Sequence, residues 1–268
     1  LQYGLATTET LADTSRRVSI PSECNLRFDM TIAELPTERV LAGRGVVFAL
    51  LAQLLGEDTG KLAGGEAIGA LRHVLETLGE DESLVALDRY SDDQLPDAET
   101  LAGRWVRWFD HGRVSPYEGS NVPVTAGGTT PRLADVAGFY KAFGMSVSGD
   151  RPDHVVAELE FMSLITLAQA DAIARGDMDG TEICVEIARA FVRDHVGCWL
   201  DGWVARVGEV EDLRPWWPVA ATAALFVRSE ARLRNVIPLH GSTMLTADNE
   251  VPDDEDAMFS CGDECEIS

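Results

Sequence analysis

The feature that most constrains this chain is the helical spacing of its apolar residues, which runs from Thr37 to Asn235. In residues 65–78, for example, apolar side chains recur every three or four positions and Gly79 follows, as at the end of an amphipathic helix. The same spacing predicts helices over 37–55, 65–78, 97–109, 130–143, 152–175, 181–207 and 218–235. Strict alternation and hairpin signals are absent from this sequence. We therefore predict an all-α fold, with the helices in a single globular bundle.

Two flanking segments lack this spacing. Residues 1–36 show no sustained period and are predicted to form an irregular arm that ends at Pro36. Residues 236–268 carry nine carboxylate side chains and neither Lys nor Arg, so charge repulsion predicts a flexible acidic tail. The predicted organisation is an N-terminal arm (1–36), an all-helical domain (37–235) and a tail (236–268).

The net charge of -23 narrows the range of partners. Nucleic acid and anionic membranes attract clustered lysine and arginine, so neither is an expected partner. No apolar run approaches the roughly 18 residues that a membrane-spanning helix needs, and membrane insertion is not expected. A basic or amphipathic peptide, in contrast, would be attracted to this chain.

Cysteine usage and the N-terminal sequence favour the cytoplasm. Cys24, Cys184 and Cys198 are scattered within an odd total of five cysteines, which is typical of reduced thiols. The pair Arg16-Arg17 is not followed by the apolar core of an export signal. We predict a cytoplasmic protein that is a monomer or a weak homodimer.

Short motifs for catalysis are absent. The sequence has no phosphate-binding loop with its lysine, no Gly-x-Ser-x-Gly and no His-Glu-x-x-His. The glycine-rich residues 127–131 precede a predicted helix and could attract an anion, although a linker with a helix cap explains them more simply. Cys261 and Cys265 supply only half of a zinc site. We predict a binding protein, not an enzyme, with no metal or other cofactor.

The most distinctive segment begins at Asp150, just before a predicted helix. Asp150 is expected to cap that helix, Pro152 to occupy its first turn and Asp153 to lie at the positive end of its dipole. His154 and Glu158 are four residues apart and are expected to share one face of the helix.

A second group lies on the next long helix, where Phe191, His195 and Trp199 recur every four residues. If the two helices pack together, His195 approaches His154 and Glu158. Two interpretations are open. One is a buried hydrogen-bond network, and the other is a helical-bundle metalloprotein that uses these three side chains as ligands.

Three short motifs follow one another in the chain. They are Pro116-Tyr117-Glu118-Gly119-Ser120, then Pro152-Asp153-His154 followed by Glu158-Leu159-x-Phe161-Met162, then Phe191-x-x-x-His195-x-x-x-Trp199. Together they resemble the TorD/DmsD/NarJ family of molybdoenzyme maturation chaperones. The first motif is similar to one in the chaperones of the type II DMSO reductase family. The resemblance covers roughly residues 37–235.

The resemblance implies an all-α fold of the TorD type and a cytoplasmic chaperone dedicated to one system. Such a protein binds the catalytic subunit of a molybdenum-containing oxidoreductase, often through its N-terminal leader, including twin-arginine leaders. It holds that subunit until the molybdenum cofactor is inserted, before assembly or export. A retained structural subunit of the oxidoreductase is a further alternative.

The resemblance also implies which residues meet the client. Asp153 and His154 are expected at the peptide-binding surface, with Pro152 shaping the loop. Charge-assisted pairs with carboxylates suit a leader that carries arginines, and Trp105 and Trp108 are candidates for apolar walls or for core packing. The full set of expected client-binding residues is Tyr117, Glu118, Pro152, Asp153, His154, Glu158, His195 and Trp199.

Overall fold

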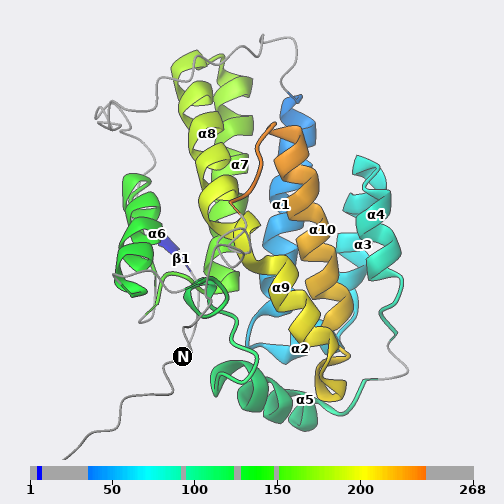
Figure 1. Cartoon of the computed structure of the whole chain (residues 1–268). Coiled ribbons are helices and arrows are strands. Elements are labelled where there is room, and N and C mark those ends of the chain that lie inside the picture. The colour runs from blue at the N-terminus through cyan, green and yellow to red at the C-terminus, as the bar shows by residue number, and fades with distance from the viewer. Residues whose placement is uncertain (1–4, 8–35, 92–94, 124–127, 148–150, 240–268) are drawn as a thin grey trace, which may run out of the picture.

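The computed structural model describes residues 5–7, 36–91, 95–123, 128–147 and 151–239, which are predominantly helical (Figure 1). The longest helices are α1 (Glu38–Leu55), α7 (Val155–Arg175), α8 (Met178–Phe191) and α10 (Trp217–Leu233). The others are α2 (Thr59–Ala63), α3 (Glu66–Leu78), α4 (Asp81–Leu87), α5 (Ala98–Trp105), α6 (Thr130–Ala142) and α9 (Gly197–Gly208). The predicted all-α fold is confirmed.

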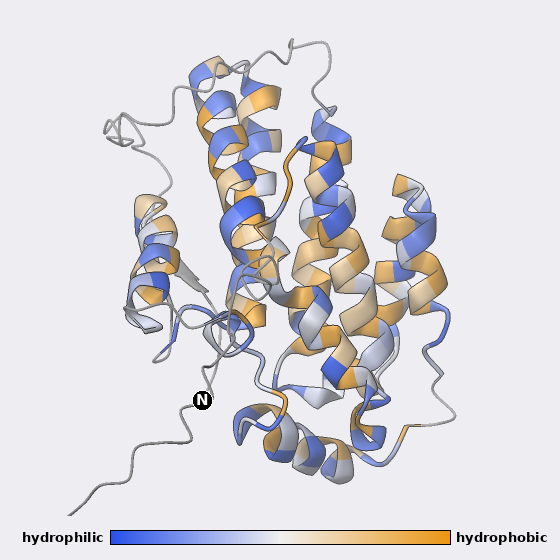
Figure 2. Cartoon of the chain, in the orientation of Figure 1, coloured by the Kyte–Doolittle hydropathy of each residue, from blue (hydrophilic) through white to orange (hydrophobic). Residues whose placement is uncertain are grey.

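Helices α1 and α7 form the centre of the bundle, and α8, α10 and α3 pack against this pair. The two central helices approach each other closely at Gly45, where the Ser163 hydroxyl donates to the Gly45 carbonyl at 2.8 Å. A Cβ atom on Gly45 would come within 2.6 Å of Leu167, so this crossing requires glycine. Figure 2 shows hydrophobic and hydrophilic residues mixed along the helices. The central helix α7 buries nearly every residue from Val155 to Ser163, as expected for a helix covered on most sides.

The helix boundaries follow from local capping chemistry. Thr37 caps α1 by accepting a hydrogen bond from the Val40 amide at 3.4 Å. Gly79 ends α3 and Gly176 ends α7, both with a left-handed backbone that glycine adopts without strain. These ends agree with the sequence prediction.

The helix predicted over 181–207 is not regular. A π turn, Val192–Val196, separates α8 from α9, and a second π turn, Val106–Asp110, follows α5. The apolar spacing gives no sign of such an insertion, because a single wider turn shifts the pattern by only one residue.

The start of α7 also differs from the prediction. The helix begins at Val155 and is capped by His154, so Pro152 lies outside it. Asp153 therefore takes no part in a first helical turn, and Asp150 lies outside the described residues. The N-cap of α6 is Thr129, whereas the pair Thr130-Pro131 predicts Thr130 in that position.

The structure also contains short elements that the apolar spacing does not predict. Helices α2 and α4 were not predicted, nor was a small antiparallel sheet in which β1 (Leu5–Thr7) pairs with β2 (Met145–Val147). The sheet places three residues of the predicted irregular arm against the chain just after α6.

The tryptophans of α5 and its π turn lie away from the predicted site. Trp105 is buried against Phe109, with ring centroids 6.1 Å apart. Trp108 is half-buried, and its indole donates to Asp212 at 3.0 Å. The burial of Trp105 supports core packing, and a role of either tryptophan as a wall of the client groove stays a prediction.

A buried ion network ties α1 to α10. Arg44 donates to Glu230 and to Glu80, and Glu230 also accepts from Arg234. Burial opposes ionisation of Glu230, but the two arginines outweigh it and lower its pKa.

Several sequence predictions concern residues outside the described part of the chain: Arg16, Arg17, Cys24, Gly127, Cys261 and Cys265. Among the helices that the structure describes, none has the length and apolar character required to span a membrane.

Candidate functional site

The first two motifs lie side by side because their backbones pair. The Glu118 amide donates to the Asp153 carbonyl at 2.8 Å. Tyr117 and His154 form an isolated antiparallel bridge next to it. Residues more than thirty positions apart in the sequence are thereby joined at the N-terminal end of α7.

The Asp153 carboxylate holds this loop together from inside. It is fully buried, accepts from the Gly119 amide at 2.9 Å and pairs with Arg151 at 2.6 Å. The Arg151 guanidinium lies over the Tyr117 ring, 4.2 Å from its centroid. A Cβ atom on Gly119 would come within 3.0 Å of the Asp153 carboxylate. The positive charge of Arg151 thus neutralises Asp153 locally.

His154 joins the loop to the helix. Its Nδ1 atom accepts a hydrogen bond from the Val156 amide at 3.2 Å, and its ring meets the Tyr117 ring edge-on, 5.0 Å between centroids. Burial lowers the pKa of His154 to about 3, so the ring is neutral and Nδ1 is free to accept. Just before it, the Pro152 carbonyl accepts a hydrogen bond from the Tyr140 hydroxyl at 2.9 Å.

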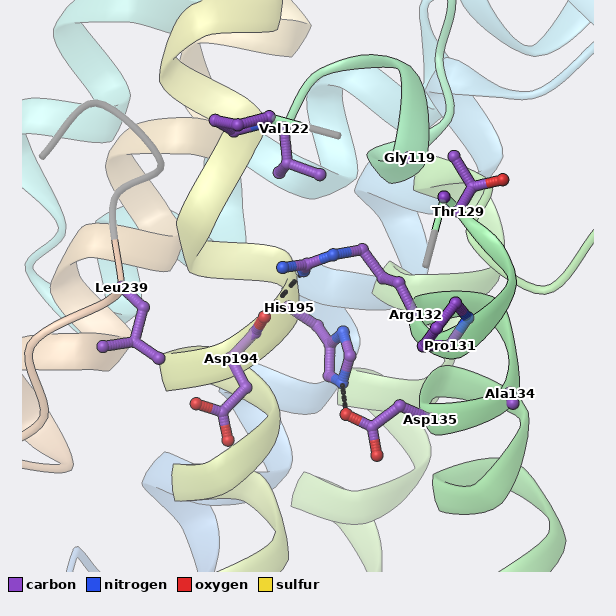
Figure 3. Close-up of a pocket in the computed structure, with 12 residues that line it drawn as sticks. Gly119, Val122, Thr129, Pro131, Arg132, Ala134, Asp135, Asp194, His195 and Leu239 are labelled. Carbon is purple, nitrogen blue, oxygen red and sulfur yellow. Dashed lines mark hydrogen bonds and ion pairs between the residues drawn. The ribbon is translucent and has the colours of Figure 1, made fainter. Parts of the chain in front are cut away.

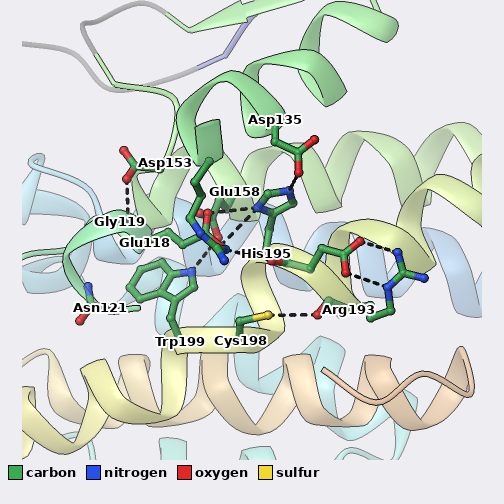
Figure 4. A network of polar contacts seen from close by, with 12 residues as sticks. Glu118, Gly119, Asn121, Asp135, Asp153, Glu158, Arg193, His195, Cys198 and Trp199 are labelled. Atoms are coloured by element: carbon green, nitrogen blue, oxygen red, sulfur yellow. Dashed lines mark hydrogen bonds and ion pairs between the residues drawn. The ribbon is translucent and has the colours of Figure 1, made fainter. Parts of the chain in front are cut away.

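A charged network connects the first motif to the third (Figure 4). His195 Nδ1 lies 3.1 Å from Glu118 and its Nε2 lies 3.3 Å from Asp135, the second contact being an ion pair without good hydrogen-bond alignment. Arg132 also donates to Glu118. Burial opposes charge on His195, but Asp135 and Glu118 outweigh it and raise its pKa to about 9. The ion pair with His195 in turn lowers the pKa of Asp135.

Glu158 lies next to this network but behaves differently. Its Oε2 atom accepts a hydrogen bond from the Trp199 indole at 3.0 Å, and Oε1 has no partner among the described residues. Complete burial, with the nearby Glu118 charge, raises the pKa of Glu158 well above its usual range. Burial therefore favours the neutral form of Glu158, whereas the carboxylates around His195 favour its cationic form.

The π turn at Val192–Val196 makes the surrounding contacts possible. In a wider turn, backbone carbonyls are released from the regular helical ladder. The Arg193 carbonyl accepts from the Leu239 amide at 2.9 Å and from the Cys198 thiol at 3.0 Å. The Asp194 carbonyl accepts from Arg132 at 3.1 Å. The turn thus attaches both α6 and the segment after α10.

A pocket of about 710 Å³ opens beside this network (Figure 3). Its charged lining comes from Arg132, Asp135, Asp194 and His195. Its apolar lining comes from Val122, Pro123, Pro131, Ala134 and Leu239. The side chain of Asp135 is 65% exposed, whereas the histidine behind it is almost wholly covered. The pocket therefore offers carboxylate at its rim and apolar surface around it.

The structure brings the eight predicted client-binding residues together but buries most of them. Six are buried: Glu118, Asp153, His154, Glu158, His195 and Trp199. Tyr117 and Pro152 are half-buried. Of the eight, only His195 lines the pocket. Their role in client binding remains a prediction. Because most of these side chains are buried, they would affect a client by shaping the loop and the pocket.

The same geometry bears on the metal alternative. His154 binds the Val156 amide, Glu158 binds Trp199, and His195 pairs with carboxylates on other elements. Within the described residues, no group of three His, Cys, Asp or Glu side chains is arranged to hold a metal ion. The hydrogen-bond network is thus the interpretation that this geometry supports.

The segment that carries these motifs matches a known protein family. The family model described as nitrate reductase delta subunit matches residues 61–205, which is more than half of the chain. The chain belongs to this family. The resemblance to molybdoenzyme maturation chaperones is therefore confirmed. All three motifs, α6 and the π turn beside the pocket lie within the matched residues.

Two curated relatives add detail. The chain is 31% identical over 120 residues to the chlorate reductase assembly chaperone protein of Ideonella dechloratans, covering 42% of this chain and 60% of the relative. It is 34% identical over 109 residues to the selenate reductase assembly chaperone protein of Thauera selenatis, covering 38% of this chain and 54% of the relative. The chain thus aligns with little more than half the length of these relatives. No solved structure matches it.

The residues at the pocket rim belong to none of the three motifs. Arg132 and Asp135 are three positions apart on α6 and both reach the Glu118–His195 pair. A signal was available, because residues three apart on a helix share a face and α6 begins directly after the glycine-rich stretch. The sequence does not indicate that Asp194 lines the pocket, because its position depends on the π turn.

Proposed function

We propose that this protein is an assembly chaperone for a molybdenum-containing oxidoreductase. It binds the catalytic subunit of that enzyme and holds it for cofactor insertion before assembly or export. The observation that carries the proposal is the family match, together with two relatives named as assembly chaperones of chlorate and selenate reductases.

The protein acts by binding and not by turnover, and it does so in the cytoplasm. The buried polar groups of the motifs support this proposal, because each is engaged in holding another segment in place. Asp153 holds the loop, His154 caps α7, and Glu118 is paired with two cations. None of these three presents a free nucleophile or base to the pocket.

The client segment binds in the pocket beside α6. Asp135 and Asp194 suit a basic side chain, which can form charge-assisted hydrogen bonds with carboxylates. Val122 and Leu239 suit an adjacent apolar side chain. The net charge of -23 attracts such a segment before contact. An N-terminal leader with arginines and an apolar stretch has this chemistry, as does a basic amphipathic internal segment.

The test of the role is recovery of the client. The tagged protein is purified from its own organism while molybdenum enzymes are being made, at that organism's native salt. We expect one molybdenum-dependent catalytic subunit to be enriched in a form that lacks its cofactor. Recovery of no such subunit, while the enzyme is present in the same cells, would contradict the proposal.

The test of the site uses two matched aspartates. Asp135 and Asp171 have side chains that are 65% and 66% exposed, but Asp171 lies on the last turns of α7, at the other end from the motifs. We expect Asp135→Asn to weaken the client complex by roughly tenfold, the loss of one charge-assisted contact. Asp171→Asn should leave it unchanged. Equal affinities of the two variants would move the client site elsewhere.

The composition of the mature enzyme distinguishes an assembly chaperone from a structural subunit that stays in the oxidoreductase. Size-exclusion chromatography of the active oxidoreductase should show that this chain is missing from it. Stoichiometric co-elution with the active enzyme would favour the subunit alternative. Synthetic leader and internal peptides of the recovered client then identify the bound segment by titration.

A further inference from the structure

A second pocket has a volume of about 410 Å³. It is formed by the segment after α4, by α5 and by the turn that joins α9 to α10, and it shares no lining residue with the first pocket. Three arginines line it, Arg89, Arg104 and Arg214, against the single carboxylate of Glu211. Such an excess of positive charge is unexpected in a chain whose net charge is -23.

Arg89 is the least neutralised of the three. Its guanidinium lies over the Trp217 ring, 5.1 Å from the centroid, and no described carboxylate pairs with it. When a guanidinium stacks on an aromatic ring, its N–H donors point outward in the plane of the group and can still donate to an oxyanion. The stacking also holds the group in place before a ligand arrives.

The other two arginines are only partly neutralised. Arg104 lies 3.5 Å from Asp212, but the same carboxylate accepts from the Trp108 indole and lies 3.9 Å from Arg107. One carboxylate is therefore shared between two guanidiniums.

Arg214 pairs with Glu211 at 3.0 Å, with both side chains more than two-thirds exposed. An exposed pair of this kind is weak and exchanges easily for a better acceptor.

We propose that this pocket binds the phosphate group of a small molecule. Phosphate presents several charged oxygens, which is what converging guanidinium forks recognise. The volume lies within the range of small-ligand sites, and the aromatic ring of Tyr90 and the apolar side chain of Leu95 line it beside the arginines. The site is independent of the client pocket, so its failure would leave the assembly role untouched.

The experiment is isothermal titration of the full-length protein with inorganic pyrophosphate, inorganic phosphate and glycerol phosphate at constant ionic strength, with citrate as a carboxylate control. The variants are Arg89→Gln, Arg89→Lys and, as the matched control, Arg175→Gln, whose exposed side chain pairs with Asp171 on α7. We expect saturable binding of one pyrophosphate. We expect it to weaken roughly tenfold or more in Arg89→Gln, to weaken less in Arg89→Lys and to stay unchanged in Arg175→Gln.

Other outcomes are decisive as well. Tighter binding of glycerol phosphate than of inorganic phosphate supports a phosphorylated organic ligand, and the reverse order supports free phosphate. Absence of saturable binding by the wild-type protein would overturn the proposal, as would citrate binding as tightly as pyrophosphate. Equal losses in Arg89→Gln and Arg175→Gln would show a general charge effect. If Arg89→Gln loses helical circular dichroism, Arg214→Gln, at a side chain that is 71% exposed, takes its place.

Discussion

Replacing His195 with glutamine tests the electrostatic account of the candidate site. His195 is a buried cation between Glu118 and Asp135, and its pKa is about 9 in the folded protein. Glutamine keeps a polar side chain of similar reach but cannot carry charge. The replacement therefore removes the cation and leaves Glu118 paired only with Arg132.

The size and sign of the effect follow from the two pKa values. Below about pH 6.5 the imidazole is protonated in both the unfolded and the folded chain, so the carboxylates contribute their full stabilisation. Between 6.5 and about 9 the unfolded chain has lost the proton while the folded protein keeps it, and the stabilisation declines. At 1.36 kcal/mol for each pH unit between those values, the contribution present at low pH is roughly 3 kcal/mol.

The assay is urea unfolding followed by far-UV circular dichroism, at several pH values from about 6 to about 9. The free energy of unfolding of wild type should exceed that of His195→Gln by about 3 kcal/mol more at the acid end than at the alkaline end. His73→Gln, at an exposed position on α3, controls for the substitution itself. A difference between wild type and His195→Gln that stays constant across this pH range would refute the reasoning.

Three further predictions use the same unfolding assay. Glu158→Gln should gain stability relative to wild type as pH rises above about 4.5, because burial raises the pKa of Glu158 and the wild-type carboxyl must then take up a proton on folding that glutamine does not need; a difference that stays constant between about pH 4.5 and 7 would contradict the raised pKa. Gly197→Ala should cost more than about 2 kcal/mol, because its Cβ would lie 2.3 Å from a carbonyl of the π turn, whereas Gly202→Ala on the same helix meets nothing within 4 Å and should be neutral or stabilising; equal effects would deny the close approach. Arg44→Met should cost about 3–5 kcal/mol by leaving Glu230 buried with one cation fewer, and a neutral outcome would mean that the network relaxes around the methionine.

The fold was predictable from sequence wherever helix ends carry local signals. Thr37 and Gly79 mark their helix ends in the sequence and in the structure alike. The π turn at Val192–Val196 was not predictable, because it is stabilised by donors from other elements, Arg132 and the Leu239 amide. The residue pattern of one segment does not reveal hydrogen-bond donors that come from other segments.

The sequence predicted which residues meet at the site, but not which of their side chains are buried and which are exposed. The motifs identified residues that do meet, including Glu118 with His195 and Glu158 with Trp199. Spacing alone treated them as a binding surface, because it cannot show that the loop carrying Glu118 folds down onto α7. The exposed carboxylate at the rim, Asp135, lay outside every motif and needed the tertiary structure to be found.

This division between buried and exposed residues has a consequence for how the protein selects a client. Glu118 and Asp153 hold the loop and the pocket in shape, so a replacement at either changes stability and pocket geometry together. Asp135, at the rim, is 65% exposed and shares the His195 cation with Glu118, so its replacement should change client affinity with a smaller loss of stability than replacement of Glu118. Measuring unfolding free energy and client affinity for Glu118→Gln and Asp135→Asn separates the two roles. Loss of affinity in both variants, with the larger loss of stability in Glu118→Gln, is the result expected if the motifs build the pocket and the rim recognises the partner.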